Sequence, residues 1–114
     1  MKQYSYKIPR PNDRTKLQDR FSLTKLYMRK KGYNLFTHQL EGVNWMLKRE
    51  LSKTTIKGGL LCDEPGLGKT IQVLATMYSN PKDKTLIIVP NSVLVQWIDK
   101  IKSILPNDSI YIHH

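Results

Sequence analysis

Glycine, lysine and threonine residues gather in the middle of this chain at a spacing that suits phosphate chemistry. Gly66 and Gly68 stand just ahead of Lys69 and Thr70, in the order Gly-Leu-Gly-Lys-Thr. Glycines let a backbone curl so that its N–H groups point inward at phosphate oxygens, and the N-terminus of a following helix favours the same anion. A lysine there can contact the terminal phosphates, and a threonine hydroxyl can ligate Mg²⁺. These residues therefore predict a binding loop for a nucleoside triphosphate.

The loop departs from the common pattern at its first position. That pattern has a glycine, four residues and then Gly-Lys-Ser/Thr, whereas here Asp63 stands in the place of the first glycine. The alternative is a surface loop ahead of an ordinary helix. The flanking sequence favours phosphate binding, because an apolar run precedes the loop and apolar residues at helical spacing follow it: Ile71, Leu74, Ala75 and Tyr78.

The elements that must position this loop alternate along the chain, which predicts an α/β fold with parallel strands and right-handed crossover helices. The apolar runs predict strands over 58–62, 85–89 and 109–113. We expect the second strand to be buried on both faces, and Cys62 to be a buried residue of the first. Helical patterns predict helices over four further segments: 22–31, 38–51, 69–79 and 92–105.

Three segments also carry a family resemblance. They are Leu-Phe-Thr-His-Gln-Leu-Glu-Gly over 35–42, Asp-Glu-Pro-Gly-Leu-Gly-Lys-Thr-Ile-Gln over 63–72, and Ile-Val-Pro-Asn-Ser-Val-Leu-Val-Gln-Trp over 88–97. In this order they resemble the Q motif, motif I and motif Ia of the Swi/Snf-like ATPases of helicase superfamily two. The resemblance implies that residues 33–114 are the N-terminal part of a RecA-like ATP-binding lobe, incomplete here. Outside the resemblance, the composition of residues 1–32 predicts a basic, mostly helical and partly flexible leader.

The resemblance also implies roles for particular residues. Gln39 would recognise adenine, Lys69 would contact the phosphates of ATP as the catalytic residue, and Thr70 would hold the Mg²⁺ that accompanies ATP. Nucleic acid would contact Pro90, Asn91 and Ser92, which follow the strand predicted over 85–89. The full set of implied ATP contacts is Gln39, Asp63, Glu64, Pro65, Gly66, Leu67, Gly68, Lys69 and Thr70.

The net charge of +10 is confined to the first half of the chain. Residues 1–57 contain 14 lysines and arginines against 4 acidic residues, whereas the two kinds balance in 58–114. The densest basic cluster is Arg29, Lys30 and Lys31. Such a cluster can follow a nucleic-acid backbone, and the alternative is a solvated face that only keeps the protein soluble.

The composition of the chain limits the compartment and the kinds of partner that we expect. One cysteine cannot form an internal disulfide and suits a reducing intracellular compartment, such as the nucleus or a cell infected by a large DNA virus. No apolar run approaches the ~20 residues of a membrane helix, so no membrane partner is expected. The three histidines are too dispersed to predict a metal site of their own.

The resemblance implies a DNA-dependent ATPase or translocase that acts on double-stranded DNA. The sequence lacks an acidic Walker-B segment and a second lobe, so we expect these residues alone to bind ATP without hydrolysing it efficiently. A further chain that supplies the rest of the ATPase is then an expected partner. Two alternatives stay open: a basic nucleic-acid-binding module with a vestigial nucleotide site, and a truncated fragment without a function of its own.

Overall fold

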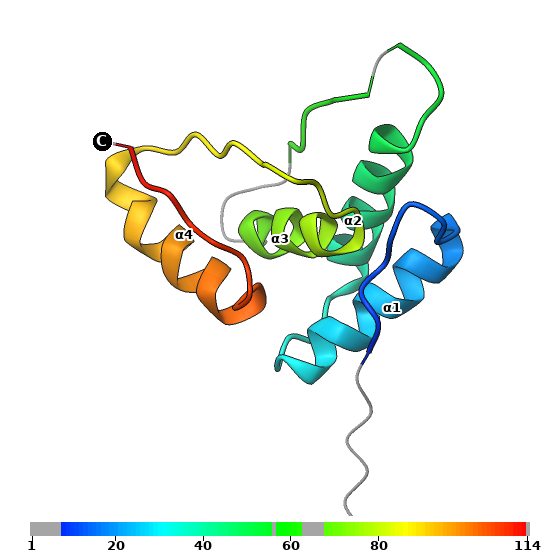
Figure 1. Ribbon diagram of the computed structural model, residues 1–114, viewed down its shortest axis with the longest axis horizontal. Helices are drawn as coiled ribbons and strands as arrows, with labels where there is room; N and C mark the ends of the chain where they lie inside the picture. Colours follow the sequence, from blue (N-terminus) through cyan, green and yellow to red (C-terminus); the bar gives the residue numbers. More distant parts are fainter. Residues whose placement is uncertain (1–7, 56, 63–67, 114) are drawn as a thin grey trace, which may run out of the picture.

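Four helices make up the regular secondary structure of the computed structural model, which describes residues 8–55, 57–62 and 68–113. They are α1 (Leu17–Lys30), α2 (Thr37–Glu50), α3 (Lys69–Ser79) and α4 (Asn91–Ile104). Figure 1 shows α3 in the middle, with α1 and α2 on one side of it and α4 on the other. Within the described ranges, no helix has both the length and the apolar character to cross a bilayer.

The core forms around α3 because the other three helices all pack against it. Helical spacing predicted that Leu74, Ala75 and Tyr78 lie on one face of this helix, and all three are buried. The remaining buried apolar side chains come from α1, from α2 and from the end of α4: Met28, Val43, Leu47, Ile104 and Leu105.

Most helix boundaries follow the local sequence closely. The helix predicted over 69–79 is α3, and α2 and α4 each begin one residue earlier than predicted. α1 begins at Leu17 rather than near Ser22, so residues 17–21 belong to this helix. Gly32 follows its end with a φ of 93°, a backbone conformation that suits glycine.

The predicted α/β fold, a partial RecA-like lobe with parallel strands, is wrong for the described part of the chain, which contains no β-strand. The segments predicted as strands, 58–62, 85–89 and 109–113, have neither helical nor strand structure. Leu86 is 84% and Ile88 is 86% exposed, and Cys62 is exposed rather than buried. A helix closes its hydrogen bonds within one segment, whereas a strand needs a paired neighbour, which an apolar run alone does not supply.

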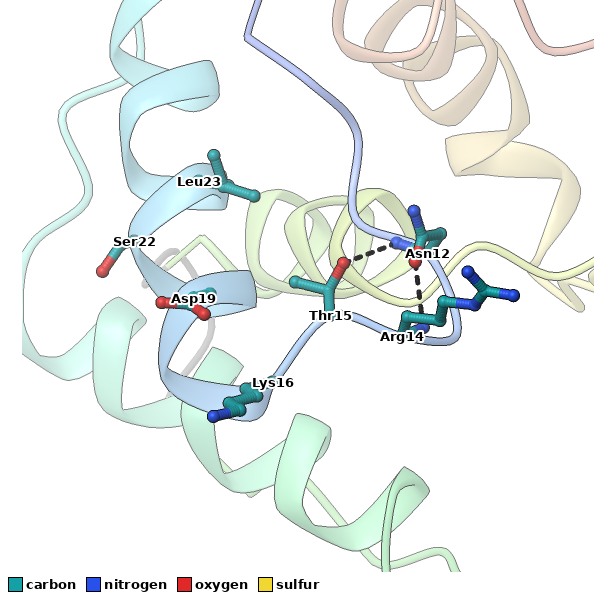
Figure 2. A pocket seen from close by; sticks show the side chains of 7 residues that line it. All are labelled: Asn12, Arg14, Thr15, Lys16, Asp19, Ser22 and Leu23. Carbon is teal, nitrogen blue, oxygen red and sulfur yellow. Dashed lines mark hydrogen bonds between the residues drawn. The ribbon is translucent and has the colours of Figure 1, made fainter.

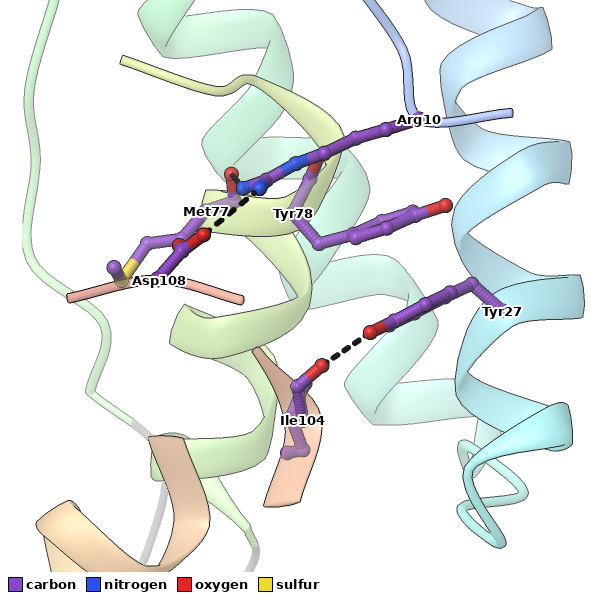
Figure 3. Close-up of polar contacts among 6 residues, drawn as sticks. All are labelled: Arg10, Tyr27, Met77, Tyr78, Ile104 and Asp108. Atoms are coloured by element: carbon purple, nitrogen blue, oxygen red, sulfur yellow. Dashed lines mark hydrogen bonds and ion pairs between the residues drawn. The ribbon is translucent and has the colours of Figure 1, made fainter. Parts of the chain in front are cut away.

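Two arginines hold the C-terminal end of α3. Arg20 is 2% exposed and donates from Nη1 to the carbonyl of Ser79 at 2.7 Å. Arg10 donates from Nε to the carbonyl of Tyr78 at 3.2 Å and from Nη2 to that of Met77 at 3.1 Å (Figure 3). Cations near a helix C-terminus satisfy its last carbonyls and interact favourably with the negative end of its dipole. The basic segment before and within α1 is thereby tied to the central helix.

Tyr78 links this end of α3 to α1. Its ring stacks on that of Tyr27 with the centroids 3.8 Å apart, as Figure 3 shows. Arg10 lies over the other side of the Tyr78 ring, 5.3 Å from its centroid. The Tyr78 hydroxyl is buried and has no hydrogen-bond partner among the described residues. Burial, and to a lesser extent Tyr27, raises the pKa of Tyr78 to about 12, and Arg10 opposes this rise.

The stability of the fold should therefore fall at high pH. A tyrosine whose pKa is higher in the folded state stabilises that state fully below its unfolded pKa of 10.0, and this contribution is lost as the pH rises through about 12. We expect the free energy of unfolding to fall more steeply between these values in the wild type than in Tyr78→Phe, as measured by urea denaturation at each pH. The phenylalanine variant loses no hydrogen bond, which makes it a matched control. Equal slopes in the two proteins would contradict the prediction.

Candidate functional site at the N-terminus of α3

A cavity of about 400 Å³ opens at the start of α3. Its walls come from the first turn of α3 and from α4: Gly68, Lys69, Thr70, Ile71, Gln96, Trp97 and Lys100. Two of these side chains are lysines and none is acidic. Because the N-terminus of α3 adds its positive dipole end, the cavity suits an anion.

Gly68 shapes the entry to α3. It is the N-cap residue, with φ 80° and ψ 41°. A Cβ at this position would lie 2.2 Å from Nε2 of Gln39, so glycine is needed both for the backbone angle and for the close approach of that side chain. Gln39 is 6% exposed, and its Oε1 accepts a hydrogen bond from the Phe36 N–H at 2.8 Å. The structure thus brings together Gln39 and the Gly68-Lys69-Thr70 sequence, which were predicted from separate segments.

A second glycine contact fixes how α2 packs on α3. A Cβ on Gly42 would lie 1.9 Å from Oε1 of Gln72, whose side chain is fully buried. Gln72 is the last residue of the segment over 63–72 that carries the second of the three motifs. Its burial between the two helices means that α2 approaches α3 closely just beside Gln39 and Gly68.

Five of the predicted ATP contacts lie outside the described residues: Asp63, Glu64, Pro65, Gly66 and Leu67. Lys69 and Thr70 are both half-buried on the cavity wall. Sequence reasoning missed two other wall residues, Gln96 and Lys100. They stand four positions apart on α4, and this spacing places them on one face of the helix beside Trp97. Trp97 is partly buried against the core and also lines the cavity.

The predicted nucleic-acid contacts form two separate groups. Pro90, Asn91 and Ser92 are exposed at the N-terminal end of α4. Arg29 and Lys30 are exposed at the end of α1, and Lys31 places its Nζ 5.6 Å from the centroid of the Tyr27 ring. The Tyr27 hydroxyl donates to the carbonyl of Ile104, at the opposite end of α4 from Pro90. The two groups therefore do not make one continuous patch.

The described residues offer little to a metal ion beyond the Thr70 hydroxyl. They contain no group of three or more histidine, cysteine, aspartate or glutamate side chains that could hold one. Mg²⁺ keeps several water ligands and is commonly held by substrate phosphates together with one or two protein oxygens. A magnesium ion at this cavity would therefore be held mainly by the phosphates of a nucleotide and by water.

A larger hollow of about 570 Å³ lies beside the turn that precedes α1 (Figure 2). The turn is local: the Asn12 N–H donates to Oγ1 of Thr15 at 2.9 Å, and the Arg14 N–H donates to Oδ1 of Asn12 at 2.9 Å. This hollow contains none of the predicted site residues and mixes Arg14 and Lys16 with Asp19. The smaller cavity at α3 is therefore the better candidate for a site.

The chain belongs to the SNF2-related domain family, whose model matches residues 38–113. It is 42% identical over 88 residues to an ATP-dependent helicase of Schizosaccharomyces pombe, a match that covers 70% of this chain and 8% of that relative. The human SWI/SNF-related matrix-associated actin-dependent regulator of chromatin subfamily A member 1 is 33% identical over 93 residues, with coverages of 77% and 8%. The resemblance to Swi/Snf-like proteins is thus confirmed.

A viral relative has a similar degree of identity. The "Probable global transactivator" of Orgyia pseudotsugata multicapsid polyhedrosis virus is 41% identical over 71 residues, which cover 60% of this chain and 14% of the relative. No solved structure matches the chain. The chain spans only 8% to 14% of the length of these three relatives.

Proposed function

We propose that this chain binds ATP with Mg²⁺ at the N-terminus of α3, as the ATP-binding portion of a SNF2-type ATP-dependent helicase. The observation that carries the proposal is the cavity in which Lys69 and Thr70 open a helix, with Gln39 packed against the glycine that precedes them. Gln39 belongs to α2 and lies well before the loop in the sequence. The packing of α2 on α3, rather than closeness along the chain, therefore brings it to Gly68.

The residues of the cavity wall fit the phosphates of a nucleotide. A volume of about 400 Å³ lies within the roughly 300–1,000 Å³ range of small-molecule pockets. Lys69 would contact the phosphates, the Thr70 hydroxyl would supply a ligand to the magnesium ion, and Gln39 would recognise adenine. The proposal includes the loop over 63–67. Bound ATP supplies the phosphoryl group, and this chain's own residues bind and orient the phosphates through the α3 backbone and these side chains.

The activity of a whole protein is a broader proposal. The S. pombe relative is named as an ATP-dependent helicase and the human relative as a regulator of chromatin. We extend this to a DNA-dependent translocase that works on double-stranded DNA in a nucleus or with a viral genome. DNA contacts would come from Pro90 to Ser92 and from Arg29 to Lys31. Because hydrolysis also needs an acidic residue and an arginine finger, these 114 residues alone would bind ATP with little turnover.

A titration with ATP in the presence of Mg²⁺ tests the binding proposal. Trp97 lines the cavity, whereas Trp45 lies against Gly59, so Trp45→Phe leaves Trp97 as the only tryptophan reporter. We expect a saturable change in Trp97 fluorescence with MgATP, and a matching heat signal by calorimetry. The absence of both signals would overturn the proposal.

A nucleic-acid-binding module is the second candidate, and the exposed side chains of Arg29 and Lys30 favour it. Binding through such a cluster releases counterions, so the affinity for duplex DNA should fall steeply with salt. DNA binding of this kind without any ATP signal would select this second function over the first.

A further inference from the structure

Lys100 stands on the α4 side of the same cavity. Its Nζ donates to the Tyr33 hydroxyl at 3.3 Å and lies 5.0 Å from the centroid of the Tyr33 ring. The Tyr33 hydroxyl in turn lies 3.4 Å from Oγ of Ser103. The ammonium group is therefore held in place by an aromatic face and a hydroxyl, rather than left to sample many positions in solvent.

The charge of Lys100 is not neutralised by an acidic neighbour within the structure's described ranges. The ion pair between Arg10 and Asp108 does not involve α4. The pKa of Tyr33 is lowered, first by its hydrogen bond with Ser103 and further by Lys100, while burial opposes this change. Lys100 is thus a lysine of the α4 wall whose ammonium group has a fixed place beside Tyr33.

We propose that Lys100, on the α4 wall of the cavity, is a second cation for the phosphate chain of the nucleotide. This inference rests on the proposed function. Lys69, Lys100 and the N-terminus of α3 would give the cavity three sources of positive potential from two separate elements. A triphosphate carries more negative charge than a monophosphate, so it gains more from this positive potential. Lys100 therefore contributes to a preference for nucleoside triphosphates over monophosphates.

The test measures the affinities of the chain for MgATP and for AMP by calorimetry. In Lys100→Gln we expect the affinity for MgATP to fall about tenfold and that for AMP to fall less than about twofold, because one charge-assisted phosphate contact is lost. Lys102→Gln is the matched control, since Lys102 is exposed on the same helix and does not line the cavity. Lys100→Arg keeps the charge and should retain most of the affinity for MgATP.

Lys100→Met guards against a merely structural effect, because its apolar side chain can still pack on the Tyr33 ring. Both neutral variants should show the same selective loss and unchanged circular dichroism. An equal loss for MgATP and AMP would overturn the inference, and so would wild-type affinity in both variants. If the wild type binds no nucleotide, the proposed function itself fails. If the affinity for MgATP falls in Lys69→Ala but not in Lys100→Gln, only the proposed role of Lys100 fails.

Discussion

Lys69→Ala should remove most of the affinity of this chain for MgATP. Lys69 is the first residue of α3 and lies on the cavity wall, where its ammonium group can reach a phosphate bound at the helix N-terminus. A hydrogen bond to a charged group contributes about 2–3 kcal/mol in such a setting, which corresponds to a loss of about 30- to 150-fold in affinity. The measurement is the dissociation constant of MgATP, from calorimetry or Trp97 fluorescence.

The stability of Lys69→Ala shows whether Lys69 acts by binding the nucleotide or by supporting the fold. A cation in the first turn opposes the helix dipole and costs about 0.3–1 kcal/mol of stability, so Lys69→Ala should unfold no more easily than the wild type. Lys82→Ala is the control, because Lys82 is an exposed lysine beyond the opposite end of α3. Wild-type affinity in Lys69→Ala would contradict the prediction. A loss of affinity that is matched by a loss of stability would mean that the lysine acts through the fold.

Local patterns predicted the positions of three of the four helices closely. α2, α3 and α4 begin within one residue of their predicted starts, because apolar spacing and the residues at helix ends act within a few positions. The positive φ at Gly68 likewise follows from a glycine directly before a helix. The meeting of Gln39 with Gly68 was implied by family resemblance alone, since no local rule joins two segments so far apart.

Contacts between distant segments could not be predicted from the sequence. The segment 85–89 reads as a buried strand, yet strand formation depends on a partner elsewhere, and no strand forms in the part of the chain that the structure describes. For Arg10 and Arg20, by contrast, contacts form that were not predicted, because the sequence analysis counted these residues only toward the positive charge. Their partners on α3 lie 68 and 59 residues away, so no spacing along the chain could reveal them.

Arg20→Met should strongly destabilise the fold. Besides its bond to Ser79, the Arg20 guanidinium donates from Nε to the carbonyl of Thr15 at 2.9 Å and from Nη2 to that of Asn12 at 2.6 Å. Methionine fills a similar space but leaves three carbonyl groups without this donor. We expect the free energy of unfolding to fall by about 3 kcal/mol, because a buried charge-assisted bond to Ser79 is lost together with two partly buried bonds. Chemical denaturation followed by circular dichroism measures this loss.

Two further variants test whether the lost contacts of Arg20 cause the loss of stability. Arg20→Lys keeps the charge but lacks the planar fork that reaches three acceptors, so its loss of stability should be intermediate. Arg14→Met removes an exposed arginine of the same segment and should change stability by less than about 0.5 kcal/mol. Equal effects in Arg14→Met and Arg20→Met would show that net charge matters rather than these contacts. Because Arg20 binds the end of α3 away from the cavity, folded Arg20→Met should bind MgATP as the wild type does.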